Sequence, residues 1–320
     1  MASLRSALVT GATGMIGSLL VERLLGEGVQ VYCVVRPGSR ARMKSASTLS
    51  VIETSFDRDE LRKSLAGISC DVVFHLASYG VQSHDRDSDQ LIDGNVRLLS
   101  HLLPAVEAWP LQRFIFSGSC SEYGFPAREN VPMSEDQPLR PTSLYGAAKA
   151  AAELCGNALA GQLKIPFVTL RIFNVFGPGE GPHRLLPAIL HALERDRPVE
   201  LTGGEQQRDL LYVEDVADAL LAAAGCASLE PLTAYNVCSG LPVRIRQVGE
   251  IAAQLLGKST SLLGWGKRPY RSDEPMWVVG NPARFREAAS WHPKLSLATG
   301  IERMITALRK PRNREHQHAV

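Results

Sequence analysis

The sequence passes directly from an apolar segment, residues 6–10, into a turn that contains Gly11, Gly14 and Gly17. An amphipathic stretch from Met15 to Leu25 follows, so the local pattern predicts a strand, a tight turn and a helix. Glycine lets the backbone approach a phosphate closely, and a helix N-terminus offers unpaired N–H groups and the positive end of the helix dipole. We therefore expect a pyrophosphate site at this turn. The turn lacks the Gly-Lys-Ser/Thr ending of a P-loop, which argues against an ATPase.

The first half of the chain alternates between apolar runs and segments of helical periodicity, which predicts an α/β fold with a parallel sheet covered on both faces. Strands are expected at residues 7–10, 29–35, 51–53, 71–77, 113–117, 167–173 and 234–237, and helices at 15–25, 59–65, 91–108 and 145–163. From about residue 175 the pattern is less regular and richer in proline and glycine, which indicates a smaller, mainly C-terminal lobe over the strand ends. The expected division is a doubly wound domain at 1–174 with returning segments near 208–240, a lobe at 175–207 and 241–310, and a flexible tail at 311–320.

Composition excludes several classes of function. A formal net charge of +2 over 320 residues gives no reason to expect nucleic-acid binding. No uncharged apolar run approaches membrane-spanning length, and the first predicted strand begins so early that no signal peptide is expected. The six cysteines are scattered without a Cys-x-x-Cys pair, which favours reduced thiols in a cytoplasmic protein. No His, Cys, Asp or Glu cluster has the spacing of a metal site, so no metal is expected.

Tyr145 and Lys149 lie four residues apart and therefore share one face of a predicted helix. An ammonium group beneath a phenol favours the phenolate, which makes Tyr145 a candidate acid or base. Ser119, just after an apolar strand, is a candidate to hydrogen-bond the same substrate oxygen. Taken alone, the tyrosine and lysine could be an amphipathic pair on a surface helix. Together with the glycine turn, they point to nicotinamide redox chemistry.

Further motifs follow in a fixed order along the chain. The set comprises Thr10-Gly-x-x-Gly-x-x-Gly17, Phe74-His-Leu-Ala77, Asn95-Val, Ser117-Gly-Ser119, Tyr145-x-x-x-Lys149, Arg171-Ile-Phe-Asn174-Val-Phe-Gly-Pro178, Arg208-Asp-Leu-Leu-Tyr-Val-Glu-Asp215-Val and Arg271-x-x-Glu274. In order and spacing these motifs resemble the extended short-chain dehydrogenase/reductase family, and within it the nucleotide-sugar epimerases, dehydratases and ketoreductases. The resemblance covers nearly the whole chain. It implies a Rossmann domain, an NAD(P) cofactor and a nucleotide-diphosphate sugar as the substrate.

The resemblance also implies roles for individual positions. The catalytic residues would be Ser119, Tyr145 and Lys149, with Lys149 also reaching the nicotinamide ribose. The implied cofactor-binding residues are Gly11, Thr13, Gly14, Met15, Ile16, Gly17, Arg36, Ser39, Arg40, Asp57, Leu76, Ala77, Asn95, Tyr145 and Lys149. The implied substrate-binding residues are Ser119, Cys120, Asn174, Arg208 and Arg271.

The end of the second predicted strand bears on the choice between NADP and NAD. It carries Arg36, Ser39 and Arg40, and no acidic residue that could accept from the ribose hydroxyls, as an NAD site usually does. A guanidinium can pair with a 2′-phosphate, so NADP(H) is expected to be preferred and NAD(H) stays possible; a solvated basic loop is the other explanation. Asp57 resembles the family aspartate that contacts the adenine amine, but it could equally cap the helix that begins near Asp59.

Residues on the substrate side also have local explanations. Asn174 could contact the diphosphate or sugar, or it could form a turn. Arg208 and Arg271 could bind the diphosphate, or they could pair locally with Asp209 and Glu274. The loop at 177–186 is expected to fold over the nucleotide sugar.

The residues after Ser119 discriminate between reactions. Dehydratases of the family carry an acid two residues before the tyrosine of this run, here Tyr123, because they must move a proton and release a hydroxyl. Cys120 and Ser121 stand at the relevant positions, and the acid Glu122 adjoins Tyr123 instead. Dehydration is therefore disfavoured, and Cys120 is interpreted as a passive small residue.

The leading hypothesis is an NADPH-dependent reductase of a nucleotide-linked 4-keto-6-deoxyhexose, with Tyr145 as the acid. The alternative is a nucleotide-sugar 4-epimerase with tightly bound NAD, since it needs the same three residues; a third is a dinucleotide-sensing protein without turnover. By resemblance, a homodimer is expected through the helices at 91–108 and 145–163. The helix at 91–108 is more apolar than a solvent-facing helix needs to be, because it carries Leu98, Leu99, Leu102, Leu103 and Val106. A helix buried in the core would have the same composition.

Overall fold

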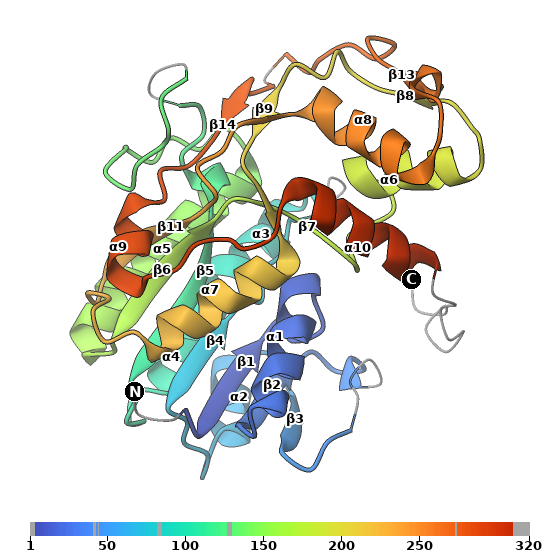
Figure 1. The fold of residues 1–320 in the computed structure, drawn as a ribbon. Helices are drawn as coiled ribbons and strands as arrows, with labels where there is room; N and C mark the ends of the chain where they lie inside the picture. Colours follow the sequence, from blue (N-terminus) through green and yellow to red (C-terminus); the bar gives the residue numbers. More distant parts are fainter. Residues whose placement is uncertain are drawn as a thin grey trace.

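A seven-stranded parallel sheet forms the centre of the computed structural model, which describes residues 4–40, 43, 45–81, 85–126, 130–272 and 274–309 (Figure 1). Neighbouring strands are parallel throughout. The chain adds β2 and β3 on one side of β1 and then β4, β5, β6 and β11 on the other side. The direction of strand addition therefore changes between β1 and β4, and open α/β sheets bind ligands at such a point. The predicted doubly wound fold is confirmed. In spatial order the strands are β11 (Thr233–Val237), β6 (Phe167–Ile172), β5 (Arg113–Ser119), β4 (Val72–His75), β1 (Ser6–Thr10), β2 (Gln30–Val35) and β3 (Leu49–Glu53).

Helices cover both faces of this sheet, and each face has its own apolar core. On one face α1 (Met15–Gly26) and α7 (Val213–Gly225) pack against each other and against the strands. On the other face lie α2 (Arg58–Ser64), α4 (Leu98–Ala105) and α5 (Leu144–Leu163). The central strands are buried on both sides, which explains why their sequences are apolar without alternation.

The helix expected at 91–108 is interrupted. It consists of α3 (Ser88–Ile92), a π-helical turn at Asp93–Arg97 and α4, which ends at Ala105. The five apolar side chains that suggested a dimer surface are buried in the core beneath the sheet (Leu98, Leu99, Leu102, Leu103 and Val106). Packing within the subunit therefore accounts for them, and they are no argument for a subunit interface.

The C-terminal part is more regular than its sequence suggests. Amphipathic helices α6 (Leu185–Glu194), α8 (Ile245–Leu256) and α10 (Leu297–Arg309) surround a third apolar cluster. Short strands connect them: β7 (Asn174–Phe176) with β10 (Leu210–Tyr212), β8 (Val199–Glu200) with β13 (Leu263–Gly264), and β9 (Gln207–Arg208) with β12 (Val243–Arg244) and β14 (Trp277–Val278). In contrast, α9 (Ala283–Ala289) packs on the large sheet, where Phe285 and Trp291 join the core beside β11.

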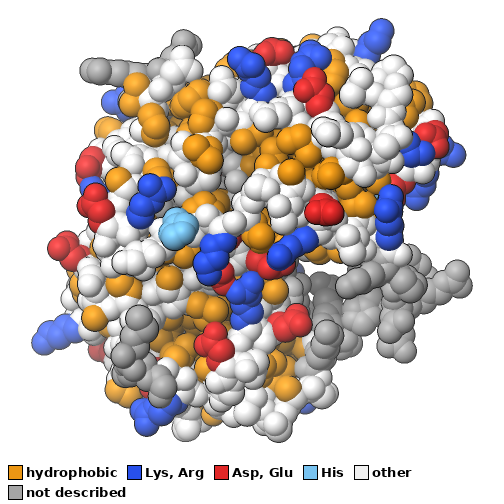
Figure 2. Space-filling model, viewed as in Figure 1, with side chains coloured by type: hydrophobic (Ala, Val, Ile, Leu, Met, Phe, Trp, Pro, Cys, Tyr) orange, Lys and Arg blue, Asp and Glu red, His pale blue; other side chains and the backbone are white. Residues whose placement is uncertain are grey.

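Charges of both signs are interspersed over the face shown in Figure 2. Ion pairs connect α7 to two other helices: Arg23 of α1 binds Asp218 of α7, and Arg303 of α10 binds Glu214 of α7 at 2.5 Å. Among the described residues, no helix has the length and apolar character needed to cross a membrane. Within the same residues, no group of three His, Cys, Asp or Glu side chains is placed to hold a metal ion.

Candidate active site

The turn between β1 and α1 is built so that only glycine fits at two of its positions. Gly11 adopts a φ of +71°, and a Cβ atom there would lie 2.6 Å from the backbone nitrogen of Ala77. A Cβ atom on Gly17 would lie 2.1 Å from the carbonyl oxygen of Gly11. The first turn of α1 has Gly14 as its N-cap and no side-chain cap, so its N–H groups are open to an incoming anion. Thr13, Met15 and Ile16 line the partly exposed part of this turn, which fits a dinucleotide pyrophosphate.

The end of β4 closes one side of the turn. Gly11 packs on the backbone of Leu76 and Ala77, and the N–H of Ala77 donates to the Thr10 hydroxyl at 3.2 Å. The same hydroxyl is 2.8 Å from Nδ1 of His75. Burial lowers the pKa of His75 to about 3, so this histidine is neutral and has a structural role beside Thr10.

Asn95 lies in the π-helical turn, and its side chain forms hydrogen bonds to neighbouring residues of the protein. Its amide group donates to the carbonyl oxygens of Leu91 at 2.8 Å and Tyr79 at 3.0 Å. Its Oδ1 accepts from the Ser78 hydroxyl at 2.8 Å. Asn95 thus fixes the loop after β4, and the cofactor contact expected for it stays a prediction.

Tyr145 and Lys149 project from the first two turns of α5, which begins at the N-cap Ser143. Burial raises the pKa of Tyr145 to about 12, although hydrogen bonding with Ser78 and Ser119 acts in the opposite direction. Lys149 is almost fully buried, and its ammonium lies 4.2 Å from the centroid of the Phe116 ring. Burial lowers its pKa to about 8. The structure therefore brings the three predicted catalytic side chains together at the ends of β5 and α5.

Ser78 is a neighbour of Tyr145 that the sequence reasoning missed. It directly follows the Phe74–Ala77 motif, so a signal was available in its position after β4. Its hydroxyl joins Tyr145 to Asn95, because it hydrogen-bonds both side chains. A second hydroxyl beside Tyr145 can help to hold a substrate oxygen at this point.

Cys120, which follows Ser119, is buried, and desolvation raises the pKa of its thiol to about 12. A thiol in this environment stays protonated, so the structure agrees with a passive role.

Glu122 is also buried, and its Oε1 accepts a hydrogen bond from the Ser119 N–H at 2.6 Å. Glu122 therefore points into the protein, and the described residues place no acid next to Tyr145 in the position a dehydratase needs.

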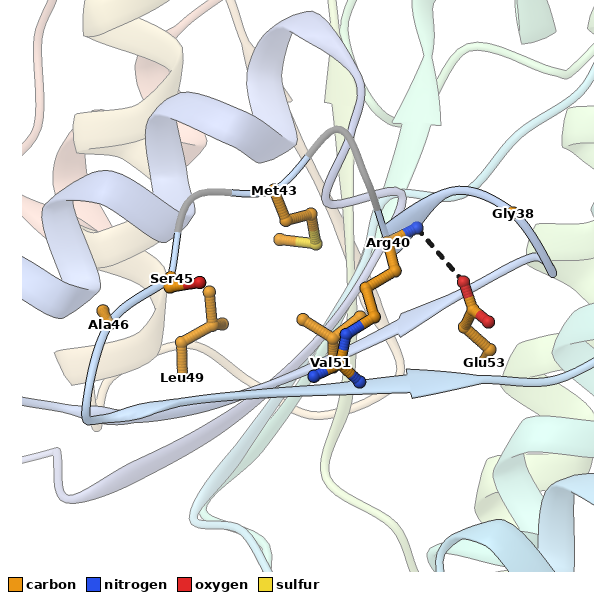
Figure 3. A pocket seen from close by; sticks show the side chains of 8 residues that line it. All are labelled: Gly38, Arg40, Met43, Ser45, Ala46, Leu49, Val51 and Glu53. Atoms are coloured by element: carbon orange, nitrogen blue, oxygen red, sulfur yellow. Dashed lines mark hydrogen bonds between the residues drawn. The ribbon is translucent and has the colours of Figure 1, made fainter.

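The loop after β2 borders a cavity of about 710 Å³ between Gly38, Arg40 and the edge strand β3 (Figure 3). The side chain of Arg40 extends across this cavity over Val51, opposite Met43 (Figure 3). Arg36 and Arg40 are exposed, and among the described residues neither guanidinium pairs with a carboxylate. Ser39, between them, is half-buried. Both guanidinium groups are therefore exposed, and the 2′-phosphate contacts expected for Arg36, Ser39 and Arg40 stay predictions.

Glu53 is an acid at this site that the sequence reasoning did not consider. It lies opposite Val35 in the β2–β3 register, and its Oε1 accepts from the backbone N–H of Arg40 at 3.2 Å. Asp57, four residues further on, caps α2 by accepting from the N–H groups of Asp59 at 3.0 Å and Glu60 at 3.4 Å. These bonds lower the pKa of Asp57 and confirm that it caps α2, while the adenine contact expected for it stays a prediction.

Arg208 and Arg271, which the sequence could not place, converge on one carboxylate. Glu274 accepts from Arg208 at 2.5 Å and from Arg271 at 2.9 Å and 3.0 Å. Arg208 and Glu274 are mostly buried, each with 13% of its side chain exposed, whereas the side chain of Arg271 is 70% exposed. The local pairing expected between Arg208 and Asp209 is absent from the described structure: Asp209 instead accepts from the N–H groups of Ser239 and Gly240, at 2.7 Å and 2.8 Å.

Asn174 begins β7 and donates from its amide to the carbonyl oxygen of Asp209 at 3.0 Å. This bond ties β7 to the segment that carries Arg208. Arg208 also lies close enough to Cys120 to affect the pKa of its thiol. Asn174, Asp209 and Arg208 therefore form one connected group near Cys120, and the substrate contacts expected of Asn174, Arg208 and Arg271 stay predictions.

Known proteins resemble this chain over nearly its whole length. The model of a family described as "NAD dependent epimerase/dehydratase family" matches residues 7–238. The UDP-glucose 4-epimerase of Mycolicibacterium smegmatis is 29% identical over 317 residues, which cover 94% of this chain and 98% of that protein. The structure of UDP-glucose 4-epimerase with UDP-glucose from Thermotoga maritima has a TM-score of 0.86 at 25% identity, covering 95% and 99% of the two chains. MoeE5 in complex with UDP-glucuronic acid and NAD has a TM-score of 0.82 at 29% identity, covering 95% and 99%.

Proposed function

The chain belongs to the NAD dependent epimerase/dehydratase family of extended short-chain dehydrogenase/reductase enzymes, and we propose that it is a nucleotide-sugar 4-epimerase that keeps NAD bound through the reaction. The observation that carries this proposal is the group of Ser119, Tyr145 and Lys149 beside the open glycine turn, with no acid placed for dehydration. The epimerase was the alternative on sequence. It now takes precedence over the ketoreductase because similar proteins are named 4-epimerases and one similar structure contains NAD.

Each catalytic side chain has a role that follows from its position. Tyr145 takes the proton of the sugar hydroxyl and later returns it to the same oxygen, while Ser119 hydrogen-bonds that oxygen. Lys149, one helical turn after Tyr145, is proposed to favour the phenolate form of Tyr145 through its charge and so to oppose the effect of burial on the pKa of that phenol. A bound NAD would supply reversible hydride transfer at the sugar carbon, and Ser119, Tyr145 and Lys149 would hold the sugar oxygen at which the proton moves. No net proton or hydride is consumed, so the reaction balances without an external reductant.

Two positive side chains are proposed to hold the diphosphate of the substrate. Arg271 is exposed, and Arg208 is nearby, so a diphosphate could take over the donors that now bind Glu274. Cys120 and Asn174 would border the sugar, and α6, α8 and α10 would supply most of the surrounding lobe, whereas α9, which the sequence assigned to the lobe, packs on the large sheet. UDP-sugars are the first substrates to test, since the similar proteins are described with UDP-glucose and UDP-glucuronic acid.

The identity of the retained dinucleotide tests this function. Purified protein is denatured and the released dinucleotide is identified, and the emptied protein is then titrated with NADH and NADPH. Retained NAD(H), together with interconversion of UDP-sugar 4-epimers and its loss in Y145F, is the expected result. Release of NADP(H), or an emptied protein that prefers NADPH by about tenfold (1.4 kcal/mol) or more, contradicts the epimerase.

The ketoreductase stays as a second candidate because of one observation. Arg36 and Arg40 flank the end of β2 without a carboxylate partner among the described residues, and such a pair suits a 2′-phosphate. Turnover of 4-keto-6-deoxyhexose nucleotides with NADPH, and none of UDP-sugar 4-epimers, would establish this candidate. Normal cellular function of Y145F without detectable turnover would instead identify a dinucleotide sensor.

We also propose a homodimer, through the second of the two helices expected from the sequence and without the buried side chains of α4. The outer face of α5 carries a stripe of small and apolar side chains, Ala147, Ala151, Leu154 and Ala158, of which Leu154 is 60% exposed. Ile92 of the adjacent α3 is 50% exposed. Two such faces could pack as helices with close backbone approach. In analytical ultracentrifugation we expect L154R to sediment as a monomer. The control L255R, which alters an exposed leucine of α8, should remain a dimer.

A further inference from the structure

Glu122 is a fully buried carboxyl group directly behind the catalytic side chains, and the mechanism above gives it no role. It ends the short 3-10 turn Cys120–Glu122 that follows β5, and it is 0% exposed. Its Oε1 accepts from the N–H of Ser119 at 2.6 Å, while Oγ of Ser119 accepts from the N–H of Ser121 at 3.2 Å. These two reciprocal bonds form a capping box, which fixes both the backbone and the side chain of Ser119.

The other oxygen of Glu122 lacks a hydrogen-bond partner although it is buried. The nearest guanidinium nitrogen, Nε of Arg171, is 3.7 Å from Oε2 and donates to Glu153 at 2.9 Å instead. Arg171 lies against both carboxyl groups, because it also pairs with Glu153, and burial followed by the neighbouring Glu153 carboxyl raises the pKa of Glu122. Two neighbouring ionised carboxylates repel, and a buried oxygen without a donor is costly. A single proton between the two groups removes both penalties.

Lys149 depends on the charge of these two carboxyl groups. Its side chain is 1% exposed, and within the described part of the chain it forms no ion pair at contact distance. Burial disfavours the charged ammonium most strongly, whereas Glu122, and to a smaller extent Glu153, favour it. A change in how these two residues share their negative charge therefore changes the charge of Lys149, and through it the phenol of Tyr145.

We propose that Glu122 is a positioning residue that fixes Ser119 with one carboxyl oxygen and shares a single proton with Glu153 through the other, so that the acidic pair carries one negative charge behind Lys149. The shared proton is a property of the fold alone, whereas its effect on Lys149 and Tyr145 rests on the proposed function. The groups that face the pair are Tyr145 and Lys149 of α5, Arg171 of β6, Cys120 of the 3-10 turn and Tyr123, which directly follows this turn.

Infrared difference spectroscopy of the apoprotein at pH 8 tests the shared proton directly. Ordinary carboxyl groups are ionised at this pH, so the carbonyl stretch of a protonated carboxyl group is expected in the wild-type protein. The band is expected to vanish in both E122Q and E153Q, because either glutamine donates to the remaining carboxylate. E180Q is the matched control, since burial raises the pKa of Glu180 to about 7, and it should keep the band. A wild-type protein without the band, or a band that survives in E122Q or E153Q, overturns the proposal.

The pH profile of kcat/KM tests the link to Lys149. E122Q leaves the whole negative charge on Glu153, which raises the pKa of Lys149 less than Glu122 does. E153Q leaves the whole charge on Glu122, which raises that pKa more. The alkaline limb is therefore expected to move to lower pH in E122Q and to higher pH in E153Q, each by about 0.5 pH unit or more. Shifts in the same direction, or none, overturn this part of the proposal. A protein without turnover would contradict the proposed function alone, because the infrared result decides the shared proton independently.

Discussion

Gly17 packs directly against Gly11: a Cβ atom on Gly17 would lie 2.1 Å from the carbonyl oxygen of Gly11, well inside van der Waals contact. G17A must therefore push α1 away from the turn, which both strains the core and moves the N–H groups proposed to bind pyrophosphate. We expect a loss of about 1–3 kcal/mol in the free energy of unfolding and a weaker affinity for the dinucleotide. Denaturant unfolding and dinucleotide titration measure the two effects.

The same helix provides the control for this prediction. Gly26 is exposed at the end of α1, and a Cβ atom there would meet nothing within 4 Å. G26A should therefore be neutral or stabilising by up to about 1 kcal/mol, because alanine favours a helix more than glycine does. If G17A and G26A behave alike, the close approach of Gly17 to Gly11 is not important for folding or binding.

Arg208 and Arg271 are expected to respond differently to substitution, because only one of them is buried. R208M leaves the mostly buried carboxylate of Glu274 with an exposed partner, and should cost about 1–3 kcal/mol of stability. R271M should leave stability within about 0.5 kcal/mol and weaken UDP binding by about tenfold, since an exposed forked donor is lost. Thermal unfolding and calorimetric titration with UDP separate the two effects. Unchanged UDP affinity in R271M would remove this residue from the substrate site.

Arg36 is expected to distinguish the two dinucleotides whichever of them the protein retains. Its guanidinium is exposed and without a carboxylate partner in the described structure, so R36E places a negative charge where a 2′-phosphate would lie. We expect the affinity for NADPH to fall by about tenfold or more while the affinity for NADH changes by less than about threefold. Fluorescence titration of the emptied protein measures both. An equal loss for both dinucleotides would show that Arg36 does not face the 2′ position.

Local signals account for the parts of the site that the sequence predicts well. The glycine turn between β1 and α1 and the one-turn spacing of Tyr145 and Lys149 are each contained within a few residues, so their geometry follows from the backbone. The parallel sheet follows similarly from continuously apolar strands. Such signals need no knowledge of which distant segments meet.

Features that depend on tertiary contacts were predicted poorly. Glu53 reaches the loop after β2 only because β3 pairs with β2, and Arg208 meets Arg271 only through Glu274. The apolar side chains of α4 have the same periodicity whether they face a core or a partner, so the sequence could not decide between them. Proline and glycine in the loops after residue 175 masked the amphipathic helices α6, α8 and α10.

The buried ammonium of Lys149 should leave a signature in the pH dependence of stability. Burial lowers its pKa from 10.5 in a free side chain to about 8 in the folded protein. Between these two pH values the unfolded chain binds a proton that the folded protein does not, so this residue makes stability rise with pH. Below about pH 8 both states are protonated, and the folded state bears the full cost, on the order of 3 kcal/mol.

Replacement of Lys149 isolates this contribution. The difference in unfolding free energy between the wild-type protein and K149M should rise steadily from about pH 8 to 10.5 and be constant below that range. Cys33 and Cys70 act in the opposite direction, because burial raises the pKa of each thiol to about 12, but they are common to both proteins and cancel in the difference. K63M, which alters an exposed lysine of α2, should give a difference that does not vary over the same range. A flat difference for K149M would mean that Lys149 keeps an ordinary pKa, and the proposed control of Tyr145 by a titrating lysine would then fail.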